Sequence, residues 1–254
     1  MRDAVVVEGA KLRHAPVGWA AAVLAAVVMP LLGVAFVGLA GTGAQGPLAA
    51  KLDGMVVGSG WDALLGTVGQ LVAVGQFLAV GFVAVWVFGR EFQDGTVAAL
   101  FALPVSRGRI ATAKFVVLGA WALVVSSAVV VVVAAAGIAT GLDPADAGLA
   151  AGLTKLWFLA VVTSSVALPV ALAASVGRGY LAGMATLIAI VAVSQVAVLF
   201  GIGGWVPFAA PGLWAVGWQS PETLVSPLQL VVAVVAAMVG VGATAAWWNR
   251  FQLR

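Results

Sequence analysis

The stretch that decides the fold class is residues 115–140, which read FVVLGAWALVVSSAVVVVVAAAGIAT. This run is long enough to cross the hydrocarbon of a bilayer, because a membrane helix needs about 20 consecutive apolar residues. Its side chains do not alternate between apolar and polar, as those of a membrane β-strand of about 10 residues would. We therefore predict that residues 115–140 form a membrane-spanning helix.

Apolar runs of similar length recur along the chain. We expect further spans over residues 19–40, 64–89, 156–176, 180–201 and 228–248. The 254 residues are 63% hydrophobic and 8% charged, whereas a soluble domain is about a quarter charged because its surface faces water. The sequence thus predicts an all-α integral membrane protein with six transmembrane helices and a single transmembrane domain over residues 1–254.

The positive charges predict how the chain is oriented. With the N-terminus in the cytoplasm, ten Lys and Arg residues lie inside and only Lys51 and Lys155 lie outside. The ten are Arg2, Lys11, Arg13, Arg90, Arg107, Arg109, Lys114, Arg178, Arg250 and Arg254. Since cytoplasmic loops carry an excess of Lys and Arg, both termini are expected in the cytoplasm.

Two segments outside the spans favour short helices. Residues 201–227 hold the Pro- and Trp-rich string GGWVPFAAPGLWAVGW, which favours interfacial or re-entrant helices on the outer side. Residues 3–14 are compatible with a short interfacial helix, with a disordered basic tail as the alternative. In the helical form, the side facing lipid would carry Val5, Val6, Gly9 and Leu12, and the side facing phosphates would carry Lys11 and Arg13.

Several kinds of chemistry are excluded by the residues themselves. The chain has no cysteine and a single histidine, His14, so it has no disulfide and no thiolate metal site. Neither a Ser–His pair, a carboxylate pair nor a metal cluster lies in the spans, so we expect no catalytic residues, no metal and no intramembrane enzyme. No charged residue lies in a span centre, which argues against ion coupling and favours an apolar or amphipathic substrate.

The densest cluster of charge lies between the second and third spans. Residues 90–114 read REFQDGTVAALFALPVSRGRIATAK, and they are longer than a turn between adjacent helices requires. Asp94 or Thr96 would cap a short helix, and Pro104 would end it. Its apolar side would carry Val97, Leu100, Phe101 and Leu103, and Ser106 would cap the next helix. Arg107, Arg109 and Lys114 would then sit at the lipid headgroups; the plainer alternative is a solvated loop that obeys the positive-inside rule.

This segment resembles the signature of ABC-2 type permeases. The shared pattern is an acidic residue, a Gly-Thr pair, an apolar turn, Leu-Pro-x-Ser-Arg and a Lys that enters the third span; only Gly108 is smaller than expected. In that family this loop holds a coupling helix that docks on a separate ATP-binding subunit, and two permeases work with two ATPases. By position, the docking element would comprise Arg90, Glu91, Asp94, Gly95, Thr96, Leu100, Leu103, Pro104, Ser106 and Arg107.

The chain lacks a phosphate-binding loop, since none of its lysines stands in a G-x-x-x-x-G-K-[ST] string. ATP and Mg²⁺ are therefore expected on the partner subunit, with no cofactor and no enzyme activity in this chain. The other expected partners are lipid and a second permease copy, as a homodimer or heterodimer, and nucleic acid is not among them. The small and polar stripe of the second span offers Gln70 and Gln76, and the fifth span offers Ser194 and Gln195. These four residues would line a translocation path or serve helix packing.

The resemblance implies an exporter in the inner or plasma membrane of a prokaryotic cell. Its substrate would be amphipathic or hydrophobic, such as a drug, an antibiotic, a peptide or a lipid-like molecule. Two alternatives stay open: an ion-coupled secondary transporter, and a non-transporting immunity or sensor protein on the same scaffold.

Overall fold

The computed structural model describes residues 2–42, 46, 56–101, 104–220, 222 and 225–252. Throughout these ranges the regular structure is helical, and six helical segments are long and apolar enough to cross a membrane. They are Pro16–Gly41, Gly60–Gln93, Arg107–Ala139, Leu149–Val176, Tyr180–Leu199 and Pro227–Arg250. The six predicted spans are thus confirmed. The second and third are longer than their apolar runs, because the helices continue into the charged segment between them.

Two of the spans are interrupted, in both cases at a proline. The first consists of α2 (Pro16–Val23), a π-helical turn (Leu24–Val28) and α3 (Met29–Gly41). A proline ring clashes with the carbonyl four residues earlier, and a wider π turn before Pro30 relieves that clash. The fourth span breaks at Pro169 into α8 (Leu149–Ala167) and α9 (Val170–Val176).

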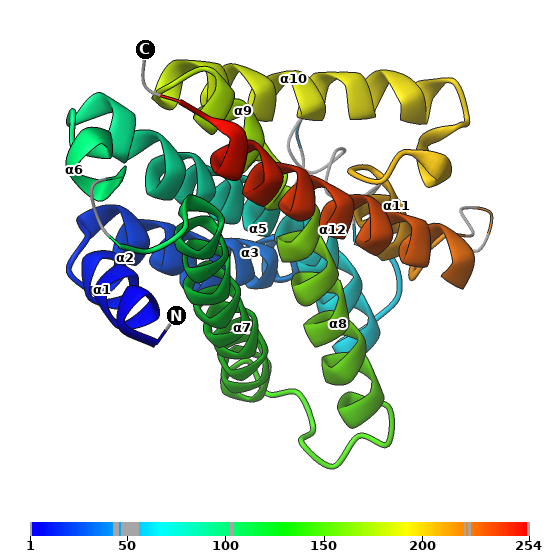
Figure 1. Cartoon of the computed structure of the whole chain (residues 1–254). Helices are drawn as coiled ribbons and strands as arrows, with labels where there is room; N and C mark the ends of the chain where they lie inside the picture. Colours follow the sequence, from blue (N-terminus) through cyan, green and yellow to red (C-terminus); the bar gives the residue numbers. More distant parts are fainter. Residues whose placement is uncertain are drawn as a thin grey trace.

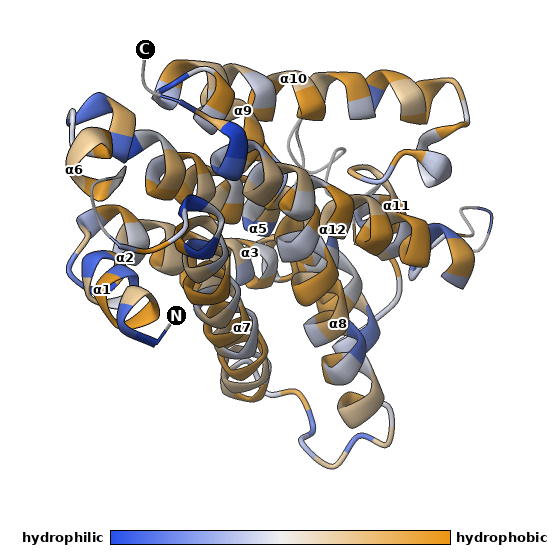
Figure 2. Cartoon of the chain, viewed as in Figure 1, coloured by the Kyte–Doolittle hydropathy of each residue, from blue (hydrophilic) through white to orange (hydrophobic). Residues whose placement is uncertain are grey.

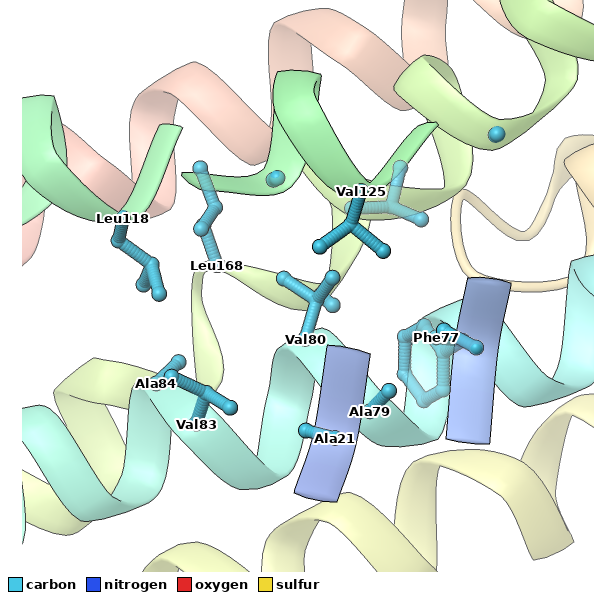
Figure 3. Close-up of a cluster of buried hydrophobic side chains, with 14 of the residues drawn as sticks. Ala21, Phe77, Ala79, Val80, Val83, Ala84, Leu118, Val125 and Leu168 are labelled. Carbon is cyan, nitrogen blue, oxygen red and sulfur yellow. The ribbon is translucent and has the colours of Figure 1, made fainter. Parts of the chain in front are cut away.

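Helix α5 (Gly60–Gln93) is the centre of the bundle. It contacts α3, α8, α9, α10 (Tyr180–Leu199) and α11 (Ala210–Val216), so most of its side chains are buried. Figure 3 shows Val80 of α5 facing Val125 of α7 (Arg107–Ala139), and Leu118, further along α7, pointing toward Ala84 and Val83 of α5. A helix that is apolar on every side is expected at such a central position.

The polar residues gather at one end of the bundle, on the left of Figures 1 and 2. This charged end holds α1 (Arg2–Arg13), α6 (Val97–Phe101), the tight turn at residues 177–179 and the last turn of α12 (Pro227–Arg250). The opposite end holds α11 and the loop over residues 140–148. Both described chain ends therefore lie at the charged end.

The last turn of α12 is held closely against the rest of the charged end. Trp248 is completely buried, and its indole N–H donates to Ser175 Oγ of α9 at 2.9 Å. Asn249 Oδ1 accepts from the backbone N–H of Gly108 at 2.8 Å. A Cβ on Gly108 would lie only 2.4 Å from Asn249 Nδ2, so the glycine that departs from the family pattern is the residue that allows this contact.

The N-terminal segment is a helix, but the predicted division of its faces is wrong for Leu12 and Lys11. Leu12 is 5% exposed and packs in the protein core, and Lys11 bonds to carboxylates instead of facing outward. Helix α1 lies against α7, and of the face that we expected in lipid Leu12 is buried whereas Val6 is exposed. The neighbouring Val7 is exposed as well.

The loop after α10 contains short helical pieces, a 3-10 turn (Gly203–Trp205) and α11. Helix α11 packs against α5 and α8. This contact covers part of the N-terminal half of α5. Trp218, just beyond α11, meets Gly69 so closely that a Cβ there would lie 2.6 Å from the indole.

Candidate functional site

Four charged side chains from three helices meet at the charged end. Lys114 Nζ donates to Glu8 Oε2 at 2.7 Å, to Glu91 Oε1 at 3.0 Å and to the Val87 carbonyl at 3.2 Å. Lys11 Nζ donates to Glu8 Oε1 at 2.8 Å and to Glu91 Oε1 at 2.9 Å. We refer to Glu8, Lys11, Glu91 and Lys114 as the ion-pair cluster. It joins α1, α5 and α7.

The ion-pair cluster is electrically balanced, and three of its members are buried while Lys11 is half-buried. Lys114 is 0% exposed, Glu91 is 2% exposed and Glu8 is 6% exposed. Two carboxylates face two ammonium groups, and Lys114 uses all three of its N–H donors. Removing charges from water costs several kcal/mol per ion, and only close pairing with further hydrogen bonds offsets that cost. The cluster meets this condition, so its members depend on one another.

Lys11 stays charged in this setting. Burial by itself lowers the pKa of the Lys11 ammonium, but the hydrogen bonds and negative charges of Glu8 and Glu91 outweigh that effect. The net pKa therefore lies above the ordinary lysine value. A raised lysine pKa means that the stabilisation is complete at neutral pH and is lost only in strongly alkaline solution.

The cluster is tied to α6 through Thr96. The Thr96 hydroxyl donates to Glu91 Oε2 at 2.7 Å, and the Thr96 carbonyl accepts from the N–H of Leu100 at 3.0 Å. Gly95 has a φ of +69°, a left-handed conformation that glycine adopts at little cost. The chain therefore turns sharply after α5 and sets the short helix directly over the ion-pair cluster.

The residues predicted for docking fall into three groups. Asp94, Gly95, Thr96, Pro104 and Ser106 are exposed. Arg90, Leu100 and Arg107 are half-buried: the Arg90 guanidinium lies 4.5 Å from the Trp86 ring and 3.8 Å from Asp94 Oδ2, and Arg107 bonds to the Phe251 carbonyl. Glu91 is buried in the cluster, and Leu103 lies outside the described residues. On the N-terminal side of the predicted docking element, the exposed surface therefore consists of residues 94–96 together with Ala98 and Ala99 of α6.

The predicted location of Lys114 at the lipid headgroups is wrong. Helix α7 begins at Arg107, so Lys114 lies two turns inside it, on the face that α1 and α5 cover. Arg109 remains exposed, as predicted for a headgroup residue, and Ser106 stands at the first cap position of α7 without a side-chain capping bond.

The sequence did not predict that these residues form one cluster. Lys11 was expected to face phosphates, Lys114 was expected at the lipid headgroups, and Glu8 was given no role. A signal was available: Lys114 stands four residues after Ile110 and four before Leu118, both buried. A charge on the apolar stripe of a helix requires a buried partner.

Gln76 serves helix packing. Its amide donates to Ser126 Oγ of α7 at 3.2 Å and to Ser164 Oγ of α8 at 2.9 Å, and the side chain is 1% exposed. Amides that bridge helices in this way hold membrane bundles together. Gln76 therefore ties three spans at mid-bundle and does not line a cavity.

The other three predicted path residues do lie together. Gln70, Ser194 and Gln195 line a cavity of about 230 Å³ between α5, α8, α10 and α11, near the end of the bundle opposite the charged end. Gln70 also donates to Gln219 Oε1 at 2.9 Å. We refer to this space as the outer cavity. Within the described ranges, no group of His, Asp or Glu side chains is placed to hold a metal ion.

Six apolar helices of membrane length, with charge confined to the bundle ends, define the chain as a multi-pass membrane protein. The family model described as "ABC-2 family transporter protein" matches residues 4–195. The chain therefore belongs to the ABC-2 transporter family, whose members are membrane transport components. The match includes the ion-pair cluster and α6 and ends within α10. Comparison with curated proteins gave no match.

Proposed function

We propose that this chain is the permease subunit of an ATP-driven exporter, and that a separate ATP-binding subunit docks on α6. The observation that carries the proposal is the bond from Thr96 to Glu91, because it connects an exposed short helix to a buried cluster shared by α1, α5 and α7. A push on α6 would then move three elements together. Packed helix interfaces respond to such a push by switching between discrete arrangements.

Membership of the ABC-2 family supports the remaining parts of the proposal. The charged end faces the cytoplasm of a prokaryotic cell, two permease copies work with two ATPases, and ATP with Mg²⁺ binds the partner. The cargo is amphipathic or hydrophobic. Support for this comes from the outer cavity, whose lining carries no Asp, Glu, Lys or Arg among the described residues.

The test uses the absence of native cysteines. Ala98→Cys places a single thiol on the exposed side of α6, and Ala145→Cys places a matched exposed thiol in the loop at the opposite end. Each variant is labelled with a maleimide photo-crosslinker, and the full-length chain is isolated in mild detergent with whatever accompanies it. Cross-linking of an ATP-binding subunit from position 98 and not from 145 is the expected result.

Transport in reconstituted vesicles distinguishes the alternatives. Vesicles that hold both subunits should move cargo only with ATP. Transport driven by a proton or sodium gradient without an ATPase would favour a secondary transporter. An ATPase that cross-links equally from both positions would remove α6 as the docking element.

A further inference from the structure

The outer cavity contains two buried hydroxyl groups with no hydrogen-bond partner in the described part of the chain. They are Thr163 Oγ1 of α8 and Ser194 Oγ of α10, from residues that are 2% and 7% exposed. Both residues line the cavity. A buried hydroxyl without a partner is unfavourable, because the hydrogen bonds that it makes to water are lost and not replaced, so such groups require an explanation.

Comparison with the other hydroxyls of the spans makes these two stand out. A Ser or Thr within a membrane helix ordinarily bonds to a carbonyl of its own helix, three or four residues earlier. At least seven hydroxyls in the described spans do so, those of Thr112, Ser127, Thr154, Ser164, Ser165, Ser175 and Thr244. Thr163 and Ser194 leave that bond unmade. Gln76 Oε1 and Trp218 Nε1 also lack a partner, but neither residue lines the cavity.

The rest of the lining indicates what kind of molecule fits. No described lining residue is charged, and the walls are mostly aliphatic. The rings of Phe77 and Phe208, which also line the cavity, meet edge to face with their centroids 6.3 Å apart. A charged ligand would lose its hydration there without a counter-ion. Drug-sized ligands occupy pockets of about 300–1,000 Å³, so a cavity of about 230 Å³ suits a small molecule or one end of a longer one.

Two residues that line the cavity have exposed side chains. Val74 of α5 is 51% exposed, and Gln195 of α10 is exposed. Both lie on membrane-length helices, so an apolar molecule could enter from the lipid between α5 and α10 without crossing water.

We propose that the outer cavity binds an uncharged amphiphile that carries a hydroxyl or carbonyl group, with Thr163 and Ser194 as its hydrogen-bond partners. As a statement about cargo, the proposal rests on the proposed transport function. As a statement about binding, it concerns this chain alone and is tested without an ATPase.

The experiment is photolabelling of the purified full-length chain in lipid nanodiscs. The probe is a ten-carbon alcohol with a diazirine in its chain, and the matched probes are the same diazirine alkane without the hydroxyl and its trimethylammonium analogue. Adducts are located by peptide mass spectrometry, and the half-saturating concentration is obtained by titration. The alcohol should label the peptides of α5, α8, α10 and α11 saturably, and the two matched probes should do so more weakly.

Near-isosteric variants assign the binding to the hydroxyls. One neutral hydrogen bond contributes about 0.5–1.5 kcal/mol, so Thr163→Val and Ser194→Ala should each raise the half-saturating concentration about 2- to 12-fold. Ser165→Ala is the control, because Ser165 lies on the same helix and bonds to the Val162 carbonyl outside the cavity.

Two outcomes would overturn the proposal. One is labelling that is equal for the alcohol and the alkane or unchanged in both variants. The other is labelling that never saturates, which would mean that water or bulk lipid fills the cavity. If the chain binds the alcohol as expected but the complex with an ATPase transports nothing, the binding site stands and the proposed transport function is wrong.

Discussion

Glu91 was expected to meet the partner subunit, but its position makes it a residue on which other buried charges depend. Glu91→Gln would leave Lys11 and Lys114 with Glu8 as their only carboxylate, and the ion-pair cluster would carry one excess positive charge. Breaking a buried pair on one side costs about 3–5 kcal/mol. We therefore expect a large fall in the thermal midpoint of the detergent-solubilised protein, measured by tryptophan fluorescence.

Two further variants make this prediction specific. Glu91→Gln combined with Lys114→Met restores the charge balance and should recover part of the lost stability. Asp94→Asn alters an exposed carboxylate of the same segment and should change stability by no more than about 0.5 kcal/mol. If Glu91→Gln and Asp94→Asn were equally mild, the cluster would not be a stabilising unit.

Gly108 is the second residue where the structure makes a sharp prediction. Gly108→Ala would force the Asn249 side chain away and break its bond to the Gly108 N–H, so the last turn of α12 would lose this contact with α7. Overpacking of this kind costs about 1–3 kcal/mol. Gly119→Ala in the same helix is the control, because its Cβ would meet nothing within 4 Å, and alanine favours the helix by about 1 kcal/mol. The thermal midpoint should fall in Gly108→Ala and rise in Gly119→Ala.

Among the elements, the membrane spans could be predicted from the sequence and the contacts at their ends could not. Each span is a continuous apolar run, so local hydropathy is sufficient to identify it. The bond between Glu8 and Lys114 joins residues 106 positions apart, and no local pattern specifies which carboxylate meets which lysine. Hydropathy also places the start of the third span at Phe115, although the helix begins at Arg107. In the sequence, polar residues of a helix that are buried in protein cannot be told from polar residues of a loop.

The same limit applies to the two candidate sites. Gln70, Ser194 and Gln195 could be selected as polar residues in apolar helices, and two helices, α5 and α10, bring them to one cavity. Thr163 could not be selected in this way, because a hydroxyl in a span ordinarily bonds to a carbonyl of its own helix. Only the structure shows that this one does not.

Helix α6 is the element whose integrity the proposed coupling requires. Leu100→Pro would remove the N–H that bonds to the Thr96 carbonyl and so disconnect α6 from the ion-pair cluster. Membrane insertion should be normal, but ATP hydrolysis by the complex should no longer drive transport. Leu100→Ala removes most of the side chain and keeps the N–H. Comparison of the two variants therefore distinguishes the effect of lost side-chain packing from the effect of a broken helix. Full coupling in Leu100→Pro would contradict the role of α6.

For the molecule as a whole, the decisive quantity is the side of the membrane on which the charged end lies. An ATPase can reach α6 only from the cytoplasm, and the excess of Lys and Arg at this end favours that orientation. In intact cells, a membrane-impermeant maleimide should label Ala145→Cys, in the loop at the opposite end, and should spare Ala98→Cys until the membrane is permeabilised. The cysteine-free native chain is the blank. Labelling of position 98 in intact cells would place α6 outside, and neither docking nor ATP-driven coupling through Thr96 and Glu91 could then operate.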